Sequence, residues 1–161
     1  LKHPHVALNK ENMNSTHRFY IHDTTRDLIK KNNEIQVRKD ADKEFIKVSS
    51  SAKNMKRILR LMSNSNPDRM TEDQIENALY EIKNNTPKKF VRIATDKNLE
   101  LKSEVEEMVS AGVLRRIGNQ VIFIDETLGD TLDDTVVHLK DKKNSGKLTI
   151  LRAKLKELSL V

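Results

Sequence analysis

Five carboxylates fall between positions 125 and 134, and this stretch is the first candidate for chemistry. They are Asp125, Glu126, Asp130, Asp133 and Asp134. Converging carboxylates can hold Mg²⁺, as in a nuclease. Their spacing matches no metal-binding loop, however, and Asp133 and Asp134 fall in the first turn of an expected helix, where the helix dipole stabilises negative charge. We therefore interpret this stretch as helix capping and predict no metal site.

Two histidines near the start of the sequence, His3 and His5, are the other candidate metal ligands. Imidazole nitrogens two residues apart can converge on a metal, but no third ligand lies nearby, so a flexible arm is the preferred interpretation. The sequence also has no cysteine, no Gly-x-Ser-x-Gly nucleophile motif and no glycine-rich phosphate loop. We expect neither an enzyme nor a cofactor or small-molecule substrate.

Basic side chains form a third candidate site, for a polyanion. The net charge is +6, and residues 1–60 hold 14 Lys and Arg against seven Asp and Glu. One expected helix presents a basic face and one expected hairpin adds two arginines, so the predicted nucleic-acid contacts are Lys53, Lys56, Arg57, Arg60, Arg115 and Arg116. Concentrated positive charge favours DNA. A solvated helix face is the alternative that the pattern leaves open.

The elements that position these side chains begin with a polar stretch, residues 1–16, which is typical of a flexible arm. Residues 17–62 contain three β-like runs followed by a helix that ends near Met62. The runs are residues 18–22, 34–38 and 43–48, and alternation in the last two predicts a small antiparallel β unit. Residues 63–70, with their serines, asparagines and proline, are predicted to be a linker.

Residues 71–124 show the order helix, helix, helix, hairpin. Thr71 and Gln74 fit a capping box, and Thr86-Pro87 starts a second, short helix, for which a strand over residues 90–94 is the competing interpretation. A third helix is expected to stop at Gly112. Two β-prone runs follow, and Gly118-Asn119 between them suits a two-residue turn.

This order resembles a winged helix-turn-helix, chiefly through residues 101–123. The resemblance implies a third helix that enters the major groove of DNA. Here that helix carries Glu100, Glu104, Glu106 and Glu107 against Lys97 and Lys102. Because carboxylates repel phosphates, groove reading is disfavoured. Backbone contact through the two wing arginines and use of the unit as a protein-binding surface stay open, and protein is the preferred partner.

Residues 125–161 are predicted to form a C-terminal helical extension. Its last helix has a leucine seam that would dock on its own domain or on a partner helix, and the predicted protein-interface residues are Leu148, Leu151, Leu155 and Leu158. The stretch from the hairpin through Leu128-Gly129, residues 131–134 and residues 139–144 is similar to small uncharacterised proteins of tailed bacteriophages. That resemblance implies a component of a virus particle.

The sequence as a whole predicts an α+β fold: a small antiparallel N-terminal β unit, a winged-helix-like centre and C-terminal helices. The expected function is that of a non-catalytic structural or adaptor subunit of a larger assembly, such as a bacteriophage virion. A DNA-binding protein is the alternative. Other protein subunits are the expected partners, with DNA second and no membrane, and the expected location is the cytoplasm or the virion.

Overall fold

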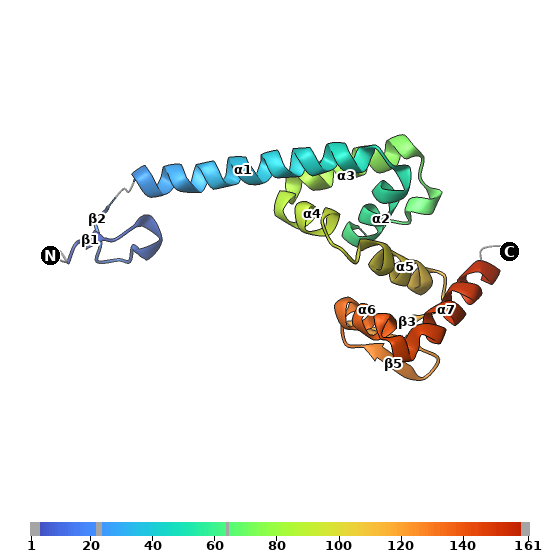
Figure 1. The fold of residues 1–161 in the computed structure, drawn as a ribbon. Coiled ribbons are helices and arrows are strands. Elements are labelled where there is room, and N and C mark those ends of the chain that lie inside the picture. Colours follow the sequence, from blue (N-terminus) through green and yellow to red (C-terminus); the bar gives the residue numbers. More distant parts are fainter. Residues whose placement is uncertain (1–3, 22–23, 64, 159–161) are drawn as a thin grey trace. The chain divides into compact units, whose positions relative to one another are not determined.

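The computed structural model of the chain describes residues 4–21, 24–63 and 65–158 (Figure 1). The chain divides into two compact units, residues 1–39 and residues 40–161. Within the described residues it forms seven α-helices and one three-stranded antiparallel sheet. The fold is therefore α+β, with helices predominating.

The first unit begins with two very short strands. β1 (Val6–Ala7) and β2 (Phe19–Tyr20) pair in parallel, and the 3-10 helix η1 (Lys10–Asn12) lies between them in the sequence. Helix α1 (Thr24–Ser49) follows and continues into the second unit. Ala7 is the one buried residue among those described in this unit. Part of the predicted flexible arm, residues 4–16, therefore has defined secondary structure.

The predicted antiparallel β unit is wrong, because residues 34–38 and 43–48 both lie inside α1. The stretch between these two runs, residues 39–42, contains Ala41, and alanine is the strongest helix former. No glycine or proline interrupts residues 24–49. Ala41, Phe45 and Val48 follow one another at helical spacing and pack into a core. Helical periodicity over this longer range therefore outweighs the short alternation.

The first core of the second unit joins the end of α1 to three further helices. These are α2 (Ala52–Met62), α3 (Glu72–Asn85) and α4 (Pro87–Ala94). The side chains at the centre of this cluster are fully or almost fully buried: Ala41, Val48, Met55, Ile58, Leu59, Ile75, Leu79 and Phe90. Because α2 and α3 share it, the predicted linker at residues 63–70 separates no domains; it contains the 3-10 helix η2 (Pro67–Arg69) instead.

The helix ends in this part follow the sequence signals. Ser51 caps α2, and Thr71 and Gln74 form the predicted capping box at the start of α3. Residues 90–94 are helical rather than a strand. Thr86 provides no side-chain cap for α4; its hydroxyl donates back to the carbonyl of Ile82.

The second core gathers the elements that follow. They are α5 (Leu99–Ser110), β3 (Arg115–Ile117), β4 (Gln120–Phe123), β5 (Glu126–Gly129), α6 (Leu132–Lys140), the 3-10 helix η3 (Lys142–Asn144) and α7 (Ser145–Leu158). Gly112 ends α5 with a φ of 78°, and Gly118 turns the hairpin with a φ of 60°, both as predicted. Strand β5 was not predicted, and it adds a third strand to the hairpin.

The winged-helix-like stretch is divided between the two cores. Helices α3 and α4 pack with α2, whereas α5 and the hairpin pack with α6 and α7. Residues 125–161, predicted to be an extension, supply one strand and two helices of the second core. The helix order and the hairpin agree with the predicted resemblance, which stays a prediction for residues 71–124. None of the helices in the described part of the chain is long and apolar enough to cross a membrane.

Candidate protein-binding surfaces

The four glutamates of α5 are all paired with arginines from other elements of the same unit. The pairs are Arg57–Glu100, Arg60–Glu107, Arg116–Glu106 and Arg152–Glu104. The arginines come from α2, β3 and α7, so three different elements neutralise one helix. The glutamates of the helix that was predicted to disfavour DNA are therefore already paired with cations of the same chain.

Two of these pairs are bidentate, which is the strongest geometry for an arginine and a carboxylate. Arg116 donates to both carboxylate oxygens of Glu106, at 2.7 and 3.0 Å. Arg152 donates to both oxygens of Glu104, at 2.7 and 2.9 Å. The hydrogen bonds to Glu104 raise the pKa of Arg152. The hairpin and α7 are thereby fixed to opposite edges of the acid-bearing helix.

Arg60 is the most enclosed of these cations, with 10% of its side chain exposed. Its guanidinium donates to Glu107 at 3.2 Å, to the hydroxyl of Ser103 at 3.3 Å and to Asp68. Ser103 is itself buried. The basic face of α2 therefore holds α2 against α5, and Arg57 and Arg60 are not free for a polyanion.

The other predicted nucleic-acid contacts are Lys53, Lys56, Arg115 and Arg116, and the first two line the same groove as Arg57 and Arg60. Lys56 lies 4.0 Å from Asp68, and Lys53 is exposed and makes no ion pair within the described residues. Arg115 is 64% exposed but donates to the carbonyl of Ile124 and lies 3.7 Å from Asp125. The structure thus brings the four α2 residues together at one groove, which Asp68 and glutamates of α5 also line, and gives most of the six an internal partner.

The leucine seam of α7 lies mainly in the chain's own core. Leu151 is fully buried, and Leu148 and Leu155 pack against the same cluster. Leu158 alone of the four is exposed, at 53%. Of the two docking modes that the sequence allowed, the structure shows contact with the seam's own domain, and it removes Leu151 from the predicted interface.

The carboxylates between positions 125 and 134 take separate partners rather than converging. Glu126 pairs with Lys147, Asp130 with Gln120 and Asp133 with Lys102, while Asp134 joins Thr131 in the helix cap predicted for α6. Within the described residues, no group of three or more acidic, histidine or cysteine residues is placed to hold a metal. His3, half of the predicted histidine pair, lies outside those residues.

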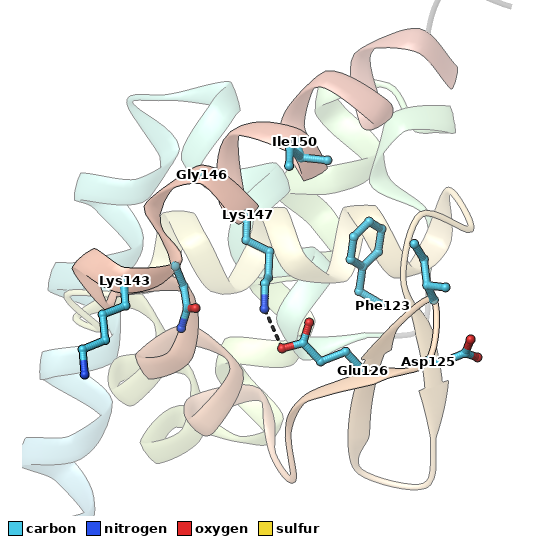
Figure 2. Close-up of a pocket in the computed structure, with 9 residues that line it drawn as sticks. Phe123, Asp125, Glu126, Lys143, Gly146, Lys147 and Ile150 are labelled. Carbon is cyan, nitrogen blue, oxygen red and sulfur yellow. Dashed lines mark hydrogen bonds and ion pairs between the residues drawn. The ribbon is translucent and has the colours of Figure 1, made fainter.

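A groove of about 600 Å³ lies between the β4–β5 turn and the start of α7 (Figure 2). It was not predicted. Its lining comprises Phe123, Ile124, Asp125, Glu126, Lys143, Asn144, Gly146, Lys147 and Ile150. Figure 2 shows Lys147 reaching from α7 to Glu126, at 2.6 Å. The ε-ammonium of Lys147 also lies 3.3 Å from the imidazole of His138. The hydrogen bond from Lys147 lowers the pKa of Glu126.

One wall of this groove has a strained residue. Ile124 has a φ of 58°, and it is the one described non-glycine residue with a positive φ. Its side chain is 62% exposed, and Ile150 of α7 is 53% exposed. A β-branched residue in this conformation is a genuine outlier.

The N-terminal unit exposes an unusual amount of apolar surface for its size. Its large, exposed apolar side chains are Leu8, Met13, Phe19, Tyr20, Ile21, Leu28, Ile29 and Ile35. Phe19 is 66% exposed and Leu28 is 60% exposed. Exposed apolar side chains favour protein interaction, because a partner that covers them displaces water. Sequence reasoning missed this surface, because it assigned Leu8 and Met13 to a flexible arm and residues 19–21 and 35 to β-like runs.

Comparison with known proteins supplies no relative from which a role could be transferred. The chain matches no protein-family model, and no curated protein sequence or solved structure is significantly similar to it. Its surfaces are therefore interpreted from their own geometry and charge.

Proposed function

We propose that the chain is a non-catalytic structural or adaptor subunit that joins a larger protein assembly through its N-terminal unit. The observation that carries this proposal is the composition of that unit: one buried residue, Ala7, stands beside eight large exposed apolar side chains within the described residues. A unit with so little core cannot offset the entropy of ordering its backbone. Contact with a partner protein would supply the missing burial.

The rest of the molecule favours a structural or adaptor role over sequence reading in DNA. Its α5, the counterpart of a reading helix in the winged-helix resemblance, has its glutamates bound by Arg57, Arg60, Arg116 and Arg152. A helix held on several sides by its own chain would have to break these pairs to enter a groove. The resemblance of the C-terminal half to tailed-phage proteins makes a virion the proposed assembly, with the cytoplasm as the site of synthesis.

Site-specific photo-cross-linking tests this proposal. A photoreactive amino acid would replace Leu28 or Phe19 in the full chain, produced in the cell in which its assembly forms. We expect a covalent adduct with another polypeptide from either position. Val137, on α6 and 69% exposed, is the matched control and should give none. Absence of adducts at both N-terminal positions would overturn the proposal.

DNA binding is the second candidate, and one observation favours it. Helix α4 presents Lys88, Lys89 and Arg92, which are exposed and make no ion pair within the described residues. A cationic helix face of this kind attracts phosphates and releases counterions. Binding of the full chain to a random-sequence duplex at two salt concentrations tests it: a steep salt dependence that is lost when these three residues become alanine would support DNA as the partner.

A further inference from the structure

The N-terminal half of α1, residues 24–39, has an apolar row that no residue of the described chain covers. Leu28 is 60% exposed and Ile35 is 49% exposed. They are seven residues apart, which is close to two helical turns, so both side chains lie on one side of the helix. Val37 is half-buried, and every other residue from 24 to 39 is exposed. The row is therefore an open surface.

Cations surround Ile35 on the surface of α1. Lys31, Arg38 and Lys39 stand four residues before, three after and four after Ile35, which are the spacings of neighbours on a helix surface. None of the three makes an ion pair within the described residues. Residues 24–39 together hold five Lys and Arg against two Asp and Glu. The surface is thus an aliphatic row bordered by cations that make no ion pair within the described residues.

We infer that residues 24–39 bind an acidic amphipathic helix of a partner protein. Such a helix would cover Leu28 and Ile35 with its apolar face and bring carboxylates to Lys31, Arg38 and Lys39. This inference rests on the proposed function and names the chemistry of the partner.

Other occupants fit this surface less well. A second copy of the chain would place the same cations against one another, which opposes association. DNA would satisfy the cations but leave the aliphatic row in water or against phosphates. A membrane-surface helix needs a broad apolar face, whereas Asn32 and Gln36 lie beside this row.

A charge-swap experiment with synthetic peptides tests the inference. The first probe is a labelled helical peptide with leucines on one face and glutamates flanking them. The second has lysine in place of each glutamate. Fluorescence anisotropy with the full chain should show binding of the glutamate peptide and a preference of about tenfold or more over the lysine peptide. Leu28→Gln combined with Ile35→Gln should remove this binding while leaving the circular dichroism spectrum of the folded chain in place.

Reversing the three charges should reverse the preference. Lys31→Glu, Arg38→Glu and Lys39→Glu together should favour the lysine peptide. The matched control reverses Arg69, Lys97 and Lys142, which are also exposed and without an ion pair in the described part of the chain. This control variant changes the net charge by the same amount as the first and should still prefer the glutamate peptide to the lysine peptide. If both triple variants behave alike, only net charge matters and the inference is wrong.

The remaining outcomes separate this inference from the proposed function. Failure of the glutamate peptide to bind, or tighter binding of duplex DNA or anionic phospholipid vesicles to the same cations, overturns the inference. If photo-cross-links from Leu28 to another polypeptide still form, the proposed adaptor function stands with a partner of different chemistry. If those cross-links also fail, both are wrong.

Discussion

Ile124 occupies a left-handed backbone conformation that opposes its own side chain. Its branched Cβ crowds the backbone at a φ of 58°, and a non-glycine residue held there costs roughly 1–3 kcal/mol. The neighbouring hydrogen bond from Arg115 to the carbonyl of Ile124 helps to hold the turn. Strain of this kind is retained where the surrounding structure fixes the backbone. Here the two strands on either side of the turn do so.

Replacing Ile124 with asparagine, which tolerates this conformation, should therefore stabilise the folded chain by about 1 kcal/mol. Urea denaturation would measure the change. Val137→Asn is the matched control, because Val137 is similarly exposed but helical, and valine and asparagine have similar helix propensities. A loss of stability on Ile124→Asn would show that the exposed isoleucine makes contacts worth more than the strain.

Lys102 links two carboxylates that lie on either side of it. It donates to Asp96 at 2.5 Å and pairs with Asp133 at the start of α6. The hydrogen bond from Lys102 lowers the pKa of Asp96 from its ordinary 3.8. Burial of Lys102 opposes its charge, but its hydrogen bonds to Asp133 and Asp96 outweigh this and raise its pKa. The cluster joins the start of α5 to the start of α6.

The lowered pKa of Asp96 gives a pH dependence with a definite sign. Its contribution to stability is present above the unfolded-state pKa and disappears as the pH falls through the lower folded-state value. Asp96→Asn should therefore destabilise the chain at neutral pH and have little effect at an acid pH at which the carboxyl of Asp96 is protonated in the folded chain. Asp125→Asn, at a carboxylate that is 94% exposed, should show no such difference. Urea denaturation at both pH values is the measurement.

At the scale of elements, the contact between α2 and α5 depends on charge as well as on apolar packing. Arg60 bridges three acceptors, Ser103, Glu107 and Asp68, from a nearly enclosed position. Hydrogen bonds to a charged group contribute roughly 1.5–3 kcal/mol, and an acceptor that loses its partner must be desolvated without compensation. The pairing therefore fixes how the second core is attached to the first.

Arg60→Met should lower the free energy of unfolding by about 2 kcal/mol, because the side chain keeps its length but loses its hydrogen bonds. Lys53→Met on the same helix is the control and should change stability by less than about 0.5 kcal/mol. Thermal denaturation followed by circular dichroism would compare them. Equal effects of the two substitutions would show that the ion pairs contribute nothing measurable.

Local signals predicted the elements well where they were strong. The capping box at Thr71, the stop at Gly112 and the turn at Gly118 all rest on backbone chemistry within a few residues, and each is confirmed. The error at α1 arose because five-residue alternation and helical spacing coincide in short windows. Strand β5 was not predicted, because the carboxylates at its start and just beyond its end, Glu126 and Asp130, were interpreted as part of a helix cap.

The candidate surfaces were harder to predict than the elements. A row of basic residues on one helix looks the same in sequence whether water or another helix covers it. The partner of Arg57, Glu100, lies 43 residues away in the chain, and that of Arg152, Glu104, lies 48 away. Such pairing depends on packing, which spacing does not encode. Exposure of Leu28 and Ile35 likewise depends on what the rest of the chain leaves uncovered.

At the scale of the whole molecule, burial is distributed unequally between the two units. Both hydrophobic cores belong to residues 40–161, whereas the described part of residues 1–39 buries Ala7 alone. Helix α1 takes part in both units. Its second half is anchored by Ala41, Phe45 and Val48, and its first half has no comparable burial. The two halves of one helix should therefore differ in stability.

Hydrogen exchange of the full chain should reveal this difference. Isolated helices of this length are marginal in water, so amides of residues 24–39 should exchange at least about 100-fold faster than those of α2, which open only with the core. Phe90→Ala, which empties the centre of the first core, should accelerate exchange in α2 and leave residues 24–39 unchanged. Equal protection of both segments in the isolated chain would show that the N-terminal unit is stable without a partner, and the reason for placing the docking surface there would be lost.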